Sequence, residues 1–446
     1  MSLQQCISIL RDKGKYIIVT SLEILKNEES SKYSKALKKL NALIKVFVNG
    51  DAPNLYDEIY VLLNPLSCLI KRDDIEEDIQ IMLLEMFINI TTIDFKFTHA
   101  IFQNEILHHL KKFLSGDSTI LRKLSAWLLC NVAVDENIVL KVYLVNEGIL
   151  DLVIKLILDE TKISVLKHQA DLLLNLLSEI KKSKVDRETF KKLFNFMTIF
   201  IDQKYEKEDE REHIKICFLK CFYKFSISGD LENLKIILDS GLHLLFPSIV
   251  KEKTDISLQI FLSIIHYLIF PTDVYFTNTL LNNGLMQTFT DILSDGNYDE
   301  NIRINVIVEI GNILCDSYEN ISLLFIDTPL VPILIEKFQI DTLNCKKEII
   351  WVFLHLTNNN IYNVGVVDIL LNLKIVELTE TLLFSLSLEE DYEYWISGVQ
   401  LLINLMYINE ISDKLSDSFK QQIRHYSHYG HGKLRKEAMI LSSLFD

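Results

Sequence analysis

The residues best suited to chemistry in this sequence are a tryptophan, an asparagine and an aspartate spaced four residues apart. They are Trp127, Asn131 and Asp135. Residues at positions i and i+4 lie on one face of a helix. An indole face attracts a Lys or Arg side chain by about 0.5–2 kcal/mol, and an Asn amide offers a donor and an acceptor to an extended backbone. The spacing predicts a helix face that binds a cationic peptide, with Asp135 receiving the charge.

The asparagine recurs at a nearly constant interval along the chain. Asn89, Asn131 and Asn175 are 42 and 44 residues apart, and Asn312 and Asn404 follow after 137 and 92 residues, close to three and two further steps. A period in this range is typical of solenoids, in which each helical unit buries its apolar face only against its neighbours. We therefore predict an all-α fold, a right-handed α-solenoid of about nine or ten armadillo repeats.

Composition supports packed helices over a turn-rich or disordered chain, since 49% of the 446 residues are hydrophobic and only 13 are Gly and 6 Pro. Residues 1–35 are expected to form an N-terminal cap of two short helices, around 7–10 and 16–26. Residues 36–415 are expected to form the solenoid, and residues 416–446 a partial C-terminal repeat or cap.

Glycines mark the corners of the predicted repeats. Gly148 lies between two apolar helical segments, and the same pattern recurs at Gly241 and Gly284. Glycine adopts the positive φ of a tight helix-to-helix corner without steric cost. Three helices in about 43 residues, with this corner before the last, indicate the armadillo pattern.

Several classes of function are disfavoured. The net charge of −15 argues against a nucleic-acid partner, and the longest apolar stretch, 260–270, is too short for membrane insertion. Phosphate-binding glycine loops, GxSxG and HExxH are missing, so we predict no enzyme activity, no cofactor and no metal site. The seven Cys lack CxxC pairs and are expected to be reduced thiols in helix cores, and the charged run 204–213 is expected to be solvated.

Three segments carry a resemblance to a known family. Residues 125–135, with Trp127 and Asn131, closely resemble the third helix of an importin-alpha armadillo repeat, and residues 309–316 and 346–357 are similar to it. The helices that follow, such as 146–153, resemble the last helix of the family's repeats. The resemblance covers roughly residues 36–415.

The resemblance implies a function. In importin-alpha, the third helices line a concave groove that holds a Lys/Arg-rich nuclear localisation signal between Trp indoles, while Asn side chains bond its backbone. It implies a monomeric adaptor of cytoplasm and nucleus, whose partners are basic cargo segments and an importin-beta-type carrier. The peptide-binding residues would be Trp127, Asn131, Asp135, Glu85, Asn89, Asp171, Asn175, Asn312, Trp351, His355 and Asn404.

The sequence departs from the family pattern at most of these positions. Trp351 is followed by His355 instead of Asn, and the other Trp positions hold the residues Glu85, Asp171, Val308 and Gln400. Carboxylates at two of them would attract cations by charge, so affinity would depend more on salt. The family's basic N-terminal segment has no counterpart near Arg11, Lys13 and Lys15.

These departures leave an alternative open. The chain can also be an armadillo scaffold with a degenerate groove that assembles a cytoplasmic protein complex. In that case the Asn side chains form a structural ladder between repeats, and Trp127 and Trp351 are core residues. Trp395 lies outside the register and is expected to be core in either case.

Overall fold

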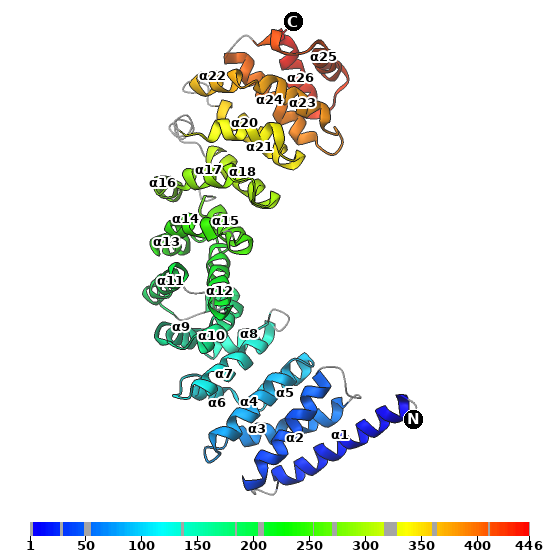
Figure 1. The fold of residues 1–446 in the computed structure, drawn as a ribbon, viewed down its shortest axis with the longest axis vertical. Coiled ribbons are helices and arrows are strands. Elements are labelled where there is room, and N and C mark those ends of the chain that lie inside the picture. Colours follow the sequence, from blue (N-terminus) through cyan, green and yellow to red (C-terminus); the bar gives the residue numbers. More distant parts are fainter. Residues whose placement is uncertain are drawn as a thin grey trace. The chain divides into compact units, whose positions relative to one another are not determined.

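The computed structural model describes residues 3–26, 30–48, 55–134, 138–182, 185–203, 209–252, 254–269, 274–315, 328–358, 364–408 and 411–445. Asp135 lies outside them. The chain divides into two compact units, Met1–Phe225 and Ser226–Asp446. The described residues form helices and their connections, without strands (Figure 1).

The N-terminal unit contains the first twelve α-helices. They are α1 Leu3–Lys26, α2 Ser30–Val48, α3 Tyr56–Ile70, α4 Glu77–Thr91, α5 Phe95–Gln103, α6 Leu107–Leu114, α7 Thr119–Val132, α8 Ile138–Asn146, α9 Ile149–Asp159, α10 Ile163–Leu176, α11 Arg187–Asp202 and α12 Asp209–Ser226, with the 3-10 helix η1 Leu177–Lys182.

The C-terminal unit continues in the same pattern. Its helices are α13 Leu231–Asp239, α14 Phe246–Glu252, α15 Asp255–Ile269, α16 Val274–Asn282, α17 Leu285–Ser294, α18 Glu300–Cys315, α20 Leu330–Ile340, α21 Leu343–Asn358, α22 Val364–Asn372, α23 Ile375–Ser385, α24 Tyr392–Ile408, α25 Asp417–Tyr429 and α26 Gly432–Phe445, with the 3-10 helices η2 Leu242–Leu245 and η3 Ser412–Lys414.

Within each unit, the long helices pack on one another in chain order. In the N-terminal unit the row is α2, α4, α7 and α10, and in the C-terminal unit it is α15, α18, α21, α24 and α26. In the C-terminal unit, a second row of helices also packs in chain order, each on the next: α14, α17, α20 and α23. Short helices such as α8, α16 and α22 connect the two rows (Figure 1). This arrangement is an α-solenoid of armadillo repeats, and the predicted fold class is confirmed.

Aromatic and aliphatic side chains fill the space between the rows. Phe246 of α14, for example, stacks on Phe261 of α15 with ring centroids 4.8 Å apart and meets Phe289 of α17 edge-on at 6.0 Å. All three are buried. Trp395 is 2% exposed, as expected for a core residue. The core is therefore shared between successive repeats instead of enclosed within one.

The N-terminal segment differs from the prediction. Residues 3–26 form one continuous helix, α1, and not two short ones. Gly14 does not break it, because a glycine inside a helix costs only about 1 kcal/mol. A Cβ at Gly14 would lie 2.8 Å from a methyl group of Leu55, so the glycine lets the helix approach α3 closely.

The cysteines also differ in part from the prediction. Cys217, Cys221 and Cys345 are buried thiols, as expected. Cys68 and Cys315 are exposed, which the expectation of core thiols did not foresee. Among the described residues, no single helix has the length and apolarity to cross a membrane, and one bent pair, Leu231–Asp239 with Leu242–Glu252, passes that test by length and composition alone.

The predicted glycine corners are confirmed. Gly148, Gly241 and Gly284 have φ values of 79°, 77° and 85°. The equivalent corner before α23 is occupied by Lys374, whose φ is 63°. A left-handed conformation costs a non-glycine residue roughly 1–2 kcal/mol, so this corner is strained where the others are not.

We expect Lys374→Gly to stabilise the C-terminal unit by about 0.5–1 kcal/mol, since relief of the strain exceeds the added freedom of the unfolded chain. The measurement is urea unfolding followed by Trp fluorescence in a Trp127→Phe background, where both remaining tryptophans report on this unit. Gly284→Ala is the matched control and should lower the midpoint. An unchanged or lower midpoint for Lys374→Gly would contradict the strain argument.

Shielded pairs of an arginine and a carboxylate secure the start of long helices to the following repeat. Arg122 of α7 bonds Glu160 at 3.1 Å, and Arg303 of α18 bonds Asp341 at 2.7 Å. The arginine side chains are only 17% and 13% exposed, and their carboxylate partners are each 6% exposed. Burial opposes ionisation of Asp341, but the hydrogen bonds from Arg303 and from the backbone N–H of Thr342, together with the charge of Arg303, lower the pKa of the carboxyl group.

We expect Asp341→Asn to destabilise the C-terminal unit by about 3 kcal/mol, because it leaves a shielded guanidinium unpaired. The pKa of Asp341 is depressed in the folded state, so its contribution is present above pH 3.8 and is lost as pH falls below that value. Urea midpoints at pH 7 and pH 3 measure both effects. Asp73→Asn is the control, since the Asp73–Lys112 pair is exposed; an equal effect of both variants would contradict the claim.

Candidate functional site

Trp127 lies on the surface of α7 and is 40% exposed, so the core interpretation of this residue is wrong. Its indole ring stacks on the imidazole of His168 from α10, with centroids 5.1 Å apart and planes 7° from parallel. Burial lowers the pKa of His168 to about 4, so the imidazole is neutral at pH 7. It therefore adds no positive charge beside the indole.

The predicted asparagines bridge successive long helices. The side-chain NH2 group of Asn131 donates to Thr91 Oγ1 of α4 at 3.1 Å, and that of Asn175 donates to the Cys130 carbonyl of α7 at 3.3 Å. Asn404 of α24 donates to Thr357 Oγ1 of α21 at 3.2 Å. These residues are partly buried. The bonds support a structural role for the ladder, and peptide binding by the same amides stays a prediction.

The ladder extends to the first long helix, which the sequence analysis missed. Asn89 of α4 donates to Asn41 Oδ1 of α2 at 3.1 Å, and Asn41 donates in turn to Glu85 Oε2 at 3.0 Å. Asn41 precedes Asn89 by 48 residues, a longer interval than the 42 and 44 residues that separate Asn89, Asn131 and Asn175. Glu85 thus accepts a hydrogen bond from a neutral amide of the neighbouring helix.

Asn312 is the exception in this ladder. Its amide donates within α18 to Glu309 Oε2 at 3.2 Å, while Glu309 Oε1 lies 2.9 Å from His266 Nδ1 of α15. The carboxylate raises the pKa of His266 by accepting this hydrogen bond, although burial opposes the change. At this position the link between repeats is therefore a hydrogen bond between a carboxylate and an imidazole, in place of the amide.

A pocket of about 370 Å³ lies over the long-helix row of the C-terminal unit. It brings together three of the predicted residues, Trp351, His355 and Asn404. Helices α21, α24 and α26 line it, and its remaining wall residues are Leu354, Asn358, Glu393, Ile396, Ser397, Gln400, Ile403, Lys433 and Glu437. We call this site the C-terminal pocket.

The indole of Trp351 is held in place within this pocket. A Cβ at Gly311 of α18 would lie 3.0 Å from ring carbon Cε3 of Trp351, so the glycine lets the ring lie close over that helix. His355 meets the ring edge-on, with centroids 4.7 Å apart. Burial lowers the pKa of His355, which keeps it neutral at pH 7. The predicted Trp351–His355 pair is therefore a packed aromatic unit.

The polar wall of the C-terminal pocket is acidic overall. Glu393 is exposed and Glu437 partly buried, against a single cation, Lys433. Gln400 of α24, at a position where the family would have Trp, donates to Glu437 Oε1 at 2.9 Å. This bond holds one carboxylate toward the pocket. An indole, an amide and two carboxylates around one cavity can bind a Lys or Arg side chain.

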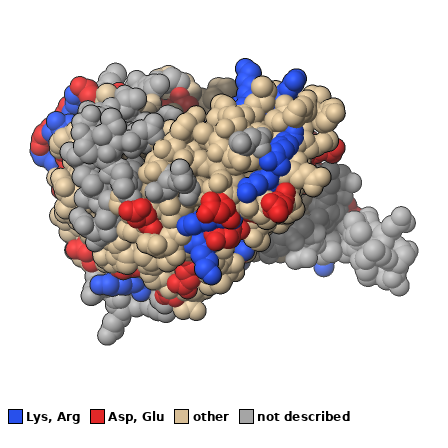
Figure 2. Space-filling model, turned by 90° about the horizontal axis from the view of Figure 1, so that it is seen from above, with Lys and Arg blue, Asp and Glu red and all other residues tan. Residues whose placement is uncertain are grey.

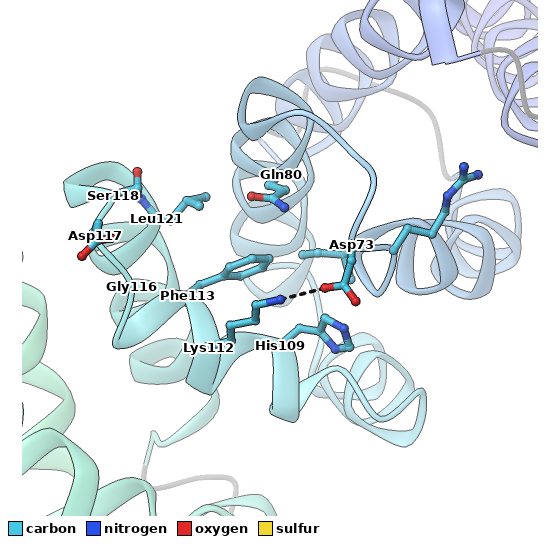
Figure 3. Close-up of a pocket in the computed structure, with 11 residues that line it drawn as sticks. Asp73, Gln80, His109, Lys112, Phe113, Gly116, Asp117, Ser118 and Leu121 are labelled. Carbon is cyan, nitrogen blue, oxygen red and sulfur yellow. Dashed lines mark hydrogen bonds and ion pairs between the residues drawn. The ribbon is translucent and has the colours of Figure 1, made fainter.

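A second cavity of about 210 Å³ lies where α3 and α4 meet α6 and α7 (Figure 3). Its wall includes Lys112 and Asp73, whose charged groups pair across it at 2.7 Å. Asp73 lies in the turn after α3 and Lys112 in the last turn of α6, and the cavity wall contains none of the predicted residues. We assign no binding role to this cavity because its facing charges already neutralise each other.

The charged surface is mixed on the face of the molecule that Figure 2 shows. Lys and Arg side chains alternate with Asp and Glu over a largely uncharged surface. On the described part of this face, no continuous band of one sign is visible.

No family model matches the chain, and no curated protein matches it. Among solved structures, the crystal structure of an engineered protein is similar over 96% of this chain and 98% of that chain, with 15% identity and a TM-score of 0.70. The likeness concerns the fold alone.

Two shorter designed proteins also align. A computationally designed armadillo repeat protein for modular peptide recognition covers 57% of this chain and 100% of its own, at 15% identity and a TM-score of 0.45. A designed armadillo repeat protein in complex with peptide (KR)4 covers 56% and 98%, at 18% identity and a TM-score of 0.41.

We expect His168→Gln to flatten the pH dependence of unfolding between pH 6.5 and 4. The pKa of His168 is about 4 in the folded chain and near 6.5 when unfolded. The unfolded chain therefore binds an extra proton in this window, and stability falls as pH is lowered through it. Urea midpoints at pH 4.5 and pH 7 for the wild type and the variant measure the effect. Parallel losses in both proteins would show that His168 is not responsible.

Proposed function

We propose that this protein is an importin-alpha-like adaptor that binds extended Lys/Arg-rich segments of cargo proteins. The observation that carries the proposal is the convergence of Trp351, Asn404 and the two carboxylates of Glu393 and Glu437 on the C-terminal pocket. Armadillo solenoids typically serve as binding scaffolds, because their stacked helices offer long surfaces for a partner.

A cationic side chain gains from two sources in this pocket. The indole of Trp351 attracts it through the ring quadrupole, and the carboxylates of Glu393 and Glu437 attract its charge. Lysine and arginine also have long aliphatic stems, which can cover the apolar wall around Ile396 and Ile403 while the charged group stays hydrated. An acidic or short side chain gains from neither source.

The amide of Asn404 can form hydrogen bonds with the peptide backbone. One hydrogen bond of its amide goes to Thr357, but an Asn side chain has a second N–H and a carbonyl oxygen. The bond to Thr357 fixes the orientation of the amide, so less rotamer freedom is lost on binding. The structural bond therefore supports a binding role instead of competing with it.

The surface around Trp127 offers a second contact. Its exposed indole rests on a neutral imidazole and precedes Asn131 by one turn. We propose that it binds another cationic side chain of the same partner class. Nuclear import and an importin-beta-type carrier follow from the resemblance to importin-alpha and are part of the proposal.

A second candidate is supported by the bridging asparagines. If their amides serve only to join repeats, the chain is a scaffold that assembles a cytoplasmic protein complex. Purification of tagged protein from cells separates the two: importin carriers and basic nuclear cargo support the adaptor, and a fixed set of non-basic partners supports the scaffold.

We expect Trp351→Leu to weaken binding of a fluorescent Lys/Arg-rich peptide by about 2- to 30-fold, the range of one cation–π contact. Leucine keeps an apolar contact over Gly311 but has no aromatic face. Glu393→Gln with Glu437→Gln should weaken binding and make it less dependent on salt, since both changes remove carboxylates. Fluorescence anisotropy at two salt concentrations gives both results.

The control is Tyr429→Ala on α25, an aromatic residue that is 73% exposed and is not part of the pocket wall. It should leave the affinity unchanged. A peptide with Glu in place of each Lys and Arg should not bind. Equal affinity of wild type and Trp351→Leu for the basic peptide would reject the C-terminal pocket as the site.

A further inference from the structure

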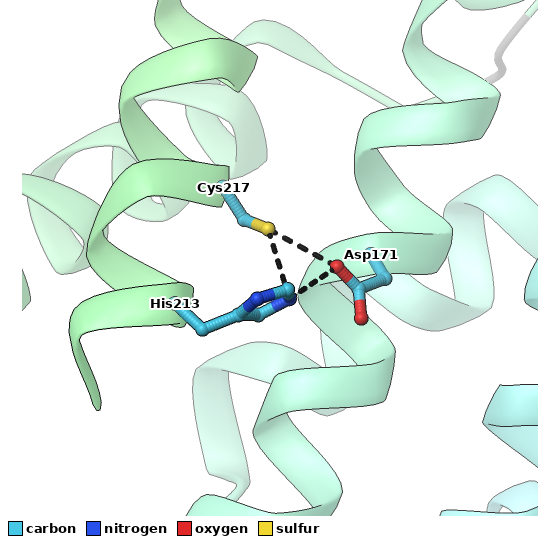
Figure 4. A group of neighbouring side chains, drawn as sticks. All are labelled: Asp171, His213 and Cys217. Carbon is cyan, nitrogen blue, oxygen red and sulfur yellow. Dashed lines mark hydrogen bonds and ion pairs between the residues drawn. The ribbon is translucent and has the colours of Figure 1, made fainter. Parts of the chain in front are cut away.

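Three potential metal ligands meet between two long helices of the N-terminal unit (Figure 4). Asp171 belongs to α10, whereas His213 and Cys217 lie one turn apart on α12. Asp171 Oδ1 is 2.7 Å from His213 Nε2 and 3.1 Å from Cys217 Sγ, and Cys217 Sγ is 3.4 Å from His213 Nε2. All three ligand atoms therefore surround one point.

We propose that Asp171, His213 and Cys217 form a zinc site that joins α10 to α12. One carboxylate oxygen, one imidazole nitrogen and one sulfur make a donor set that Zn²⁺ accepts readily, whereas Mg²⁺ and Ca²⁺ prefer oxygen alone. No metal site was predicted from the sequence. The proposal is independent of the peptide site, and it gives Asp171 a role other than the predicted contact with a basic peptide.

The distances between the three ligand atoms are close to those around a zinc ion, so only a small movement of the side chains would be needed for coordination. With metal–ligand distances of about 2.0–2.3 Å and tetrahedral angles, the donor atoms must be roughly 3.3–3.6 Å apart. The two sulfur distances already lie within a few tenths of an ångström of that range. The carboxylate–imidazole pair must open by about 0.6 Å. Side-chain rotation can provide this, because the His213 side chain is 43% exposed.

A catalytic cysteine is the main alternative reading of these three residues, and the geometry disfavours it. In a nucleophile–base–acid relay, the acid bonds one imidazole nitrogen and the nucleophile faces the other. Here Asp171 and Cys217 both face Nε2 of His213. Burial, together with the charge of Asp171, raises the pKa of the Cys217 thiol, the opposite of what activates a nucleophile. Zinc, in contrast, binds such a thiol by displacing its proton.

The solvent exposure of the three side chains indicates where the open coordination position of the metal would lie. Cys217 is 4% exposed, the Asp171 side chain 24% and the His213 side chain 43%. Solvent therefore reaches the site from the side of His213. Three protein ligands leave one position for water or for a donor from a bound partner.

The test is a cobalt and zinc titration of the full chain after treatment with a chelator and a reductant. We expect one Co²⁺ per chain, with thiolate-to-cobalt charge-transfer absorption and the visible bands of a four-coordinate ion, displaced by Zn²⁺. Cys217→Ser should abolish the charge-transfer absorption. His213→Gln, at an exposed position that should not impair folding, should weaken Zn²⁺ binding by at least about 100-fold, since loss of a mere supporting residue costs 10- to 100-fold.

Two control variants keep the result specific. Cys221→Ser changes another buried thiol one turn further along α12 and should retain the cobalt spectrum. Cys315→Ser removes the other Cys–His pair, in which Sγ lies 3.1 Å from His355 Nε2, and should retain it as well. A six-coordinate cobalt spectrum without charge transfer, or unchanged Zn²⁺ affinity in His213→Gln, would overturn the proposal. No peptide is present in these measurements, so failure of the peptide-binding proposal would not affect them.

Discussion

Packing of each long helix against the long helix of the preceding repeat is the interaction on which this structure depends. No repeat can bury its apolar face by itself, so each unit is stable only as a stack. The side chains at these junctions are consequently fixed by two helices at once. Asn131, the shielded Arg–carboxylate pairs and the three residues of the proposed zinc site each link successive repeats in this way.

The asparagine ladder shows why a repeated polar residue can serve both stability and binding. A buried amide must be hydrogen-bonded, since an unsatisfied one costs about 1–3 kcal/mol. Asn131, Asn175 and Asn404 meet this need by donating to the preceding long helix. A fixed amide is then ready for an extended backbone, because its orientation does not have to be selected on binding. The same hydrogen bond therefore stabilises the stack of repeats and fixes the orientation of the amide.

The sequence predicted the fold because its signals are local and periodic. The asparagine spacing, the glycine corners at Gly148 and Gly284 and the low glycine and proline content each reflect the geometry of a single repeat. The prediction failed where the determining contact is not local. Lys374 adopts a glycine conformation without a glycine signal, and Gly14, which lies within the continuous helix α1, packs against Leu55 at the start of α3.

The candidate sites were only partly predictable for the same reason. Trp351, His355 and Asn404 were found because they follow the repeat pattern, but Glu393 and Glu437 complete their pocket from α24 and α26 without any such pattern. The charged run 204–213 was predicted to be solvated. Residues 204–208 lie outside the described residues, and His213, at the end of the run, is exposed as predicted. The charge pattern did not predict that His213 also meets Asp171 across 42 positions of sequence, close to one repeat length. Residues one repeat apart become neighbours in a solenoid, so pairs of chemically matched residues at that separation are where new sites in such chains should be sought.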